Sequence, residues 1–334
     1  MDPETPYRPE RRARKRDQVA TEEQPQPARL ASTPPIRVLV AGAEGFLGSH
    51  LLPRLQSCGH RVRATFRDPD GPGRRTAPWA DWRPIDLTRA EQVRGLCEDC
   101  DVVVHLAGLF TRAGALTLAK VHGTGTRNLI AEAERCGVRR LVYVSVLGAR
   151  PGNADYFGTK FDAETAIVSS SIPSVILRPS IIYGPGDQFT TTIVRLLRTL
   201  PAFPMLGTGS FRLQPLAVED MVDALSQCVD RNDLDGCEFD VAGPERMTFR
   251  EIVAATASIL ELRRPIVPLP GGIAITGAQL AHRMRLPAPF TPEQLALFSS
   301  GGVLSSEDNP LIDVFRLKLL PFRDALADYL EPEA

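Results

Sequence analysis

The chain has 334 residues, a net charge of −1, 43% apolar residues and 24% charged residues, which is typical of a globular protein. This charge gives no global field that would attract nucleic acid or an anionic membrane. No run of 18 apolar residues predicts a transmembrane helix. Six scattered cysteines favour a reducing compartment, and hence a cytoplasmic protein, over a disulfide framework.

Residues 1–34 are rich in Pro, Glu, Gln, Arg and Asp and show almost no apolar periodicity. Such a segment cannot bury enough surface to order, so the sequence predicts a disordered tail. No apolar h-region follows its basic block, which excludes a secretory signal.

From residue 35 onward, strands are predicted to alternate with helices. Short apolar and β-branched runs predict strands at 36–41, 60–66, 101–108, 139–146 and 174–184, with helical patterns between them. This alternation predicts a doubly wound α/β fold, a parallel sheet with helices on both faces. We expect a Rossmann domain over 35–186, with later segments contributing, and a smaller, mainly helical lobe over 187–334.

Three glycines follow the first predicted strand. Gly42, Gly45 and Gly48 form GxxGxxG between that strand and a helix, the context in which such a triplet binds a dinucleotide. Gly42 permits the tight turn, Gly45 lets a pyrophosphate approach, and Gly48 lets the helix pack against the sheet. The pyrophosphate would lie at the positive end of that helix.

The end of the second predicted strand bears on the choice of nucleotide. An acidic residue there favours NAD, whereas an arginine accepts the 2′-phosphate of NADP. Arg67 lies where the chain leaves this strand, so NADP(H) is favoured and NAD(H) is the alternative.

Tyr156 and Lys160 in "YFGTK" are spaced i and i+4, which places both on one face of a helix. A lysine near a tyrosine stabilises the phenolate and lowers the pKa of the phenol, which makes it a usable proton donor or acceptor. The chain has only four lysines, at positions 15, 120, 160 and 318, so a lysine at this position is not expected by chance. A solvent-facing pair is the alternative interpretation.

The segments "GAEGFLG", "HLAG", "VYVSVLGA", "YFGTK" and "LRPSIIYGPGD" resemble the atypical and extended short-chain dehydrogenase/reductases, the NAD-dependent epimerase/dehydratase-like proteins. The later "RLQPLAVEDMVDAL" and "FDVAGPERMTFREIV" are similar to the branch that contains the nucleotide-binding accessory subunit of respiratory complex I. The resemblance covers residues 36–330.

The resemblance implies roles for individual residues. Tyr156 would be the catalytic acid or base, Ser145 would polarise the substrate oxygen, and Lys160 would hydrogen-bond the nicotinamide ribose. The other cofactor-binding residues that it implies are Gly42, Gly45, Phe46, Leu47, Asp86, Leu87, Leu106, Ala107, Gly108 and Pro179. No metal is implied.

Two departures from the family pattern concern turnover. Ser145 is a single serine followed by Val146, only 11 positions before Tyr156, and His122 stands where an asparagine often sits. The glycine turn and the YxxxK pair nevertheless make an NAD(P)H-dependent oxidoreductase, acting on a carbonyl or hydroxyl carbon of an unidentified small molecule, the leading hypothesis.

Two hypotheses of other classes remain open. One is an NADPH-binding structural or assembly protein of a respiratory or quinone-related complex, held at the inner membrane face by a protein partner or by the lipid surface. The apolar segment 271–284 would supply that contact, with the lid of the second lobe as the alternative use of the segment. The other is a redox sensor that reads NADPH.

Overall fold

The computed structural model describes residues 35–67, 72–109, 117–152, 155–269 and 302–330. The predicted tail and the apolar segment 271–284 lie outside these ranges. A central parallel sheet of seven strands has the order β11-β6-β5-β4-β1-β2-β3. The strands are β1 (Arg37–Ala41), β2 (Arg61–Phe66), β3 (Asp81–Pro84), β4 (Val102–His105), β5 (Arg140–Val144), β6 (Ser174–Pro179) and β11 (Glu238–Val241).

Both faces of the sheet are buried, which explains why its central strands are continuously apolar. Successive residues of β1 point to opposite faces. Val38 and Val40 therefore pack into one hydrophobic core, while Leu39 and Ala41 pack into a second core. The doubly wound Rossmann fold expected from the sequence is confirmed.

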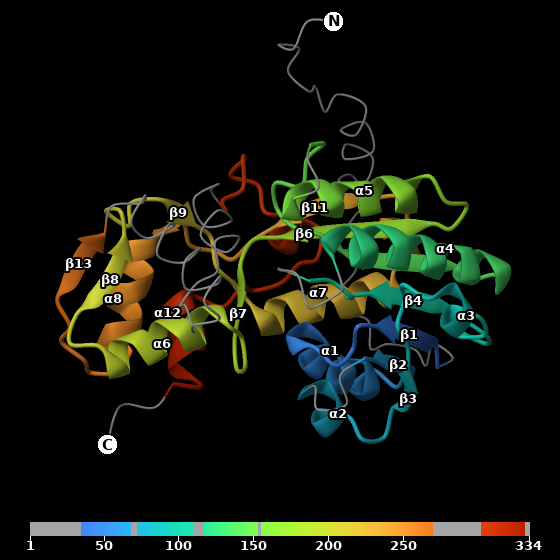
Figure 1. Ribbon diagram of the computed structural model, residues 1–334, viewed down its shortest axis with the longest axis horizontal. Helices are drawn as coiled ribbons and strands as arrows, with labels where there is room; N and C mark the ends of the chain where they lie inside the picture. Colours follow the sequence, from blue (N-terminus) through green and yellow to red (C-terminus); the bar gives the residue numbers. More distant parts are fainter. Residues whose placement is uncertain (1–34, 68–71, 110–116, 153–154, 270–301, 331–334) are drawn as a thin grey trace, which may run out of the picture.

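Helices cover each face (Figure 1). On the first face lie α1 (Phe46–Ser57) and α7 (Val218–Asp230), whose buried residues join the core of Val38 and Val40. On the second face lie α4 (Thr126–Arg135) and α5 (Tyr156–Val168). A π-helix, η2 (Ala119–Gly125), precedes α4, and the short helices α2 (Pro72–Thr76) and α3 (Ala90–Val93) follow β2 and β3.

The second lobe has a core of its own, with Phe203, Phe249 and Phe322 fully buried in it. Its helices are α6 (Phe189–Thr199), α8 (Phe249–Ile259) and α12 (Phe322–Ala327). Short strand pairs add to these helices: β8 (Phe203–Leu206) with β13 (Ile266–Leu269), β9 (Arg212–Leu213) with β12 (Met247–Thr248), and β7 (Ile182–Tyr183) with β10 (Leu216–Ala217).

The chain crosses between the two lobes more than once. After β6 it enters the second lobe, then returns as α7, the 3₁₀ turn η3 (Asn232–Leu234) and β11, before α8 leads back. The segment α11 (Pro310–Asp313) packs against β11. The second lobe therefore flanks the sheet (Figure 1), and the strand order reverses between β1 and β4, where doubly wound folds bind ligands.

Candidate cofactor and active site

The turn after β1 brings two backbone segments into contact. Gly42 has φ +80°, and a Cβ atom on it would lie 2.6 Å from the backbone nitrogen of Ala107, just beyond β4. A Cβ atom on Gly48 would lie 2.2 Å from the carbonyl oxygen of Ala43. Both glycines are therefore required by the packing of the chain itself.

Gly45 differs from these two glycines. It is the N-cap of α1 with φ −79°, and among the described residues only the Gly42 carbonyl would lie within reach of a Cβ atom on it, at 3.7 Å. In the same part of the chain no side chain caps α1, and the first turn of the helix carries no acidic residue. The first N–H groups of a helix lack intrahelical partners, so the turn leaves donors and open space for an anion. Phe46 and Leu47 begin this helix, and the arrangement fits a pyrophosphate.

The carboxyl end of β2 carries two arginines rather than one. Arg67 directly follows β2, its side chain is exposed, and its backbone N–H donates to Glu44 Oε1 at 3.2 Å. Arg74 on α2 places its guanidinium 4.2 Å from the centre of the Phe66 ring. The backbone N–H of Gly73 donates to the Glu44 carbonyl at 3.1 Å, which holds α2 against the glycine turn. Arg74 is the next arginine after Arg67 along the chain, but it was not among the cofactor-binding residues predicted from the sequence.

The remaining predicted cofactor residues lie at the same edge of the sheet, beyond the strands. Leu106 follows β4 and its N–H donates to the Ala41 carbonyl at 2.9 Å. Asp86 follows β3, where its Oδ1 accepts from the N–H and the hydroxyl of Thr88. Leu87 is buried, and Pro179 ends β6.

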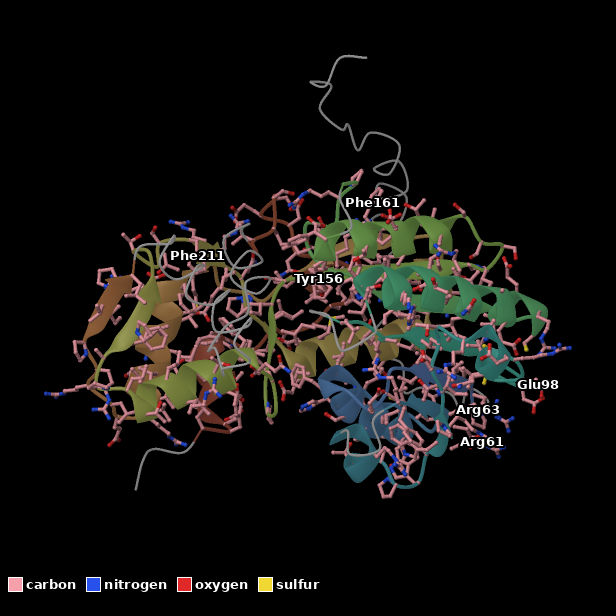
Figure 2. The ribbon with its side chains drawn as sticks, in the orientation of Figure 1. Arg61, Arg63, Glu98, Tyr156, Phe161 and Phe211 are labelled. Carbon is pink, nitrogen blue, oxygen red and sulfur yellow. The ribbon has the colours of Figure 1, made fainter. Side chains whose placement is uncertain are left out.

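Lys160 lies on α5, and its side chain reaches the edge of the sheet where the predicted cofactor residues gather, which we call the cofactor edge. A Cβ atom on Gly108 would lie 3.4 Å from the Lys160 Nζ, and that Nζ donates to the Val144 carbonyl at 3.0 Å. The side chain of Asp155 caps α5 by accepting from the N–H of Gly158 at 2.7 Å. Tyr156 therefore opens the helix, at the end turned toward the second lobe (Figure 2).

His122 lies beside Tyr156, with 5.9 Å between the ring centres. Its Nε2 accepts from the N–H of Leu109 at 3.1 Å, so Nδ1 carries the proton and donates to Thr159 Oγ1 at 2.9 Å. Burial, with a further contribution from the Lys160 charge, lowers the pKa of His122 to about 2. His122 is thus neutral and holds α5 against η2, where the sequence showed only a departure from the family pattern.

The pKa values of the pair differ from the expectation for Tyr156. Burial raises the pKa of the Tyr156 phenol above its ordinary value. The prediction of a lowered tyrosine pKa is therefore wrong for the chain itself. Burial also lowers the pKa of Lys160 to about 8, while the charge of Glu164 opposes this shift.

Ser145 directly follows β5, but its hydroxyl donates to a protein group. Its Oγ lies 2.5 Å from Oε1 of Glu164, a fully buried carboxylate on α5. Arg178 on β6 donates to the same carboxylate, with 2.8 Å from its Nε to Oε1. The structure therefore brings Tyr156 and Lys160 to the cofactor edge, while Ser145 is engaged with Glu164.

Two other features lie apart from this site. Cys97 and Cys100 precede β4, at the opposite edge of the sheet, and burial raises the pKa of both thiols, that of Cys100 to about 11. Within the described ranges, no helix is long and apolar enough to cross a bilayer.

Comparison with known proteins identifies relatives. Residues 38–242 match the NAD dependent epimerase/dehydratase family. A ceramide reductase of Caulobacter vibrioides is 31% identical over 251 residues, 72% of this chain and 76% of that protein. The mitochondrial NADH dehydrogenase [ubiquinone] 1 alpha subcomplex subunit 9 of Arabidopsis thaliana is 24% identical, with 84% and 71% covered. The structure of UDP-glucuronic acid 4-epimerase from Bacillus cereus with UDP-glucuronic acid and NAD shares the fold, with a TM-score of 0.66, 18% identity, and 88% and 98% of the chains covered.

Proposed function

Because the chain belongs to the NAD dependent epimerase/dehydratase family, we propose that it is a short-chain oxidoreductase that reduces a carbonyl carbon of a small molecule with NADPH. The observation that carries this proposal is the meeting of Lys160 with Gly108 at the cofactor edge, with Tyr156 one helical turn before it. A nicotinamide cofactor fits the glycine turn, because Gly45 offers open space beside an uncapped helix N-terminus.

Bound NADPH would supply the hydride, and the protein residues would supply the proton and the alignment. The Tyr156 phenol would carry its proton at neutral pH, as an ordinary tyrosine does. Tyr156 would donate this proton, as a general acid, to the oxygen of the carbonyl group. Lys160 would hold the ribose, and neutral His122 would fix the start of α5.

The preference for NADPH over NADH is supported by the two arginines at the end of β2. Arg67 is exposed there, and Arg74 is positioned by its stacking on Phe66. Guanidinium groups bind phosphate through paired, charge-assisted hydrogen bonds. The two side chains would hold the 2′-phosphate.

The substrate would be a ketone or aldehyde with an apolar body, because a ceramide reductase is among the similar proteins. A direct assay follows the loss of NADPH absorbance against long-chain ketones, sterol ketones and quinones. Turnover of one class supports the proposal, and absence of turnover with all of them, despite tight NADPH binding, contradicts it.

The likeness to a subunit of mitochondrial NADH dehydrogenase favours a second candidate. In it, the protein holds NADPH as a structural group within a respiratory or quinone-related complex, at the inner membrane face. Tyr156→Phe would then be silent in cells, while loss of nucleotide binding through Gly45→Val would resemble deletion of the gene. In the first candidate, the protein acts in the cytoplasm and both variants lose function.

A further inference from the structure

Tyr156, Lys160 and Glu164 follow one another at intervals of four residues on α5. This spacing puts all three on one helix face. Glu164 is fully buried, and Lys160 is 4% exposed. An ammonium and a carboxylate thus lie one turn apart where water is excluded, so the negative carboxylate favours the charged form of the ammonium.

Two strands fix the carboxylate of Glu164. Ser145, after β5, donates to Oε1 at 2.5 Å, and Arg178 on β6 donates to both carboxylate oxygens, at 2.8 and 2.5 Å. Arg178 also reaches Glu238 at 2.5 Å and Asp240 at 3.5 Å on β11. The single positive charge of Arg178 is therefore shared among three carboxylates, so it does not fully offset the negative charge of Glu164.

From this placement we infer that Glu164 is a positioning residue of the site: β5 and β6 hold its carboxylate one turn beyond Lys160 as the counter-charge of that ammonium. The inference rests on the proposed function, because it concerns the lysine that would hold the cofactor ribose. Glu164 touches neither cofactor nor substrate and acts through Lys160.

The other groups that face Lys160 do not supply this charge. His105 on β4 and His122 on η2 are neutral, with pKa values lowered by burial to about 3 and about 2. Tyr143 on β5 lies with its ring centre 4.9 Å from Nζ, and burial raises the pKa of its phenol, as it does for Tyr156 on α5. The electrostatic interaction with Glu164 raises the pKa of Lys160, against the lowering by burial.

Selective ¹³C labelling of lysine tests the inference without cofactor or substrate. The chain has four lysines, so Lys→Arg variants assign each signal, and a pH series gives the midpoint of Lys160. Glu164→Gln keeps an oxygen for Ser145 and removes the charge, while Arg178 retains Glu238 and Asp240. We expect the midpoint to fall by about 1 unit or more. Affinity for NADPH at pH 8 should then fall about five-fold, since fewer molecules carry the cationic lysine.

Glu132→Gln is the matched control, because Glu132 is another buried helix carboxylate paired with an arginine, Arg135. It should leave the midpoint of Lys160 unchanged, as should the charge-preserving Glu164→Asp. If Glu164→Gln does not fold, the double variant Glu164→Gln/Arg178→Gln removes the buried pair as a unit and should show a smaller fall in the same direction, because the cation of Arg178 is lost as well. A folded variant with an unmoved Lys160 midpoint overturns the inference. An inactive wild type with a normal shift would contradict only the proposed function.

Discussion

Gly42 and Ala107 touch through their backbones: a Cβ atom on Gly42 would lie 2.6 Å from the Ala107 nitrogen. The contact ties the turn after β1 to the chain leaving β4, which are the two neighbours at the point where the strand order reverses. The glycine turn is therefore part of the core packing, and of its three glycines Gly45 alone has open space beside it as far as the described residues show.

Substitutions of two glycines should separate ligand binding from folding. Gly45→Val places a branched side chain in open space, so it should weaken NADPH binding at least 100-fold and change the free energy of unfolding by less than about 0.5 kcal/mol. Gly48→Ala drives a methyl into the Ala43 carbonyl and should cost about 1–3 kcal/mol of stability. Calorimetry and urea unfolding measure both effects. If Gly45→Val binds NADPH with the affinity of the wild type, the turn only connects β1 to α1 and does not bind the nucleotide.

The two arginines beyond β2 should set the cofactor preference. Arg67→Ala and Arg74→Ala should each weaken NADPH binding by about 10- to 150-fold, the loss of one charge-assisted contact of roughly 1.5–3 kcal/mol. NADH affinity should be almost unchanged, because NADH lacks the 2′-phosphate. Arg83→Ala on β3, whose side chain pairs with Asp81, is the control. Equal losses for both nucleotides would refute the assignment.

The buried histidines predict a dependence of stability on pH. The pKa values of His105 and His122 lie at about 3 and about 2, below the value of 6.5 expected in the unfolded chain. Below pH 6.5 the histidines of the unfolded state therefore bind protons, while those of the folded state stay neutral, and stability is lost as the pH falls. Each histidine should lower the free energy of unfolding by about 2 kcal/mol at pH 5 relative to pH 8. Urea unfolding of the wild type and of His122→Asn should differ in this loss by that amount, and identical pH dependence would contradict a neutral His122.

The central strands and the glycine turn could be predicted from the sequence because their signals are local. The β-branched runs, GxxGxxG and YxxxK each depend on spacing within one or two elements. The structure places most of the predicted cofactor-edge residues just beyond the carboxyl ends of parallel strands, with Pro179 as the last residue of β6 and Lys160 on α5.

Other features depend on contacts between distant segments. Arg74 is positioned by the docking of α2 on the glycine turn, and no local pattern predicts this docking. The hydrogen bond from Ser145 to Glu164 depends on the register of α5 against β5. The pKa of Tyr156 depends on its burial, to which the packing of α5 against η2 contributes through His122, and spacing alone does not predict this packing.

The central claim is that Tyr156 donates a proton during turnover, and Tyr156→Phe tests it most directly. The variant lacks only one hydroxyl, so NADPH affinity by calorimetry should stay within about two-fold of the wild type. The rate of NADPH oxidation with an accepted ketone should fall by about 10²–10⁴-fold, the range of a general acid. Undiminished turnover in Tyr156→Phe, with NADPH binding intact, would contradict the account.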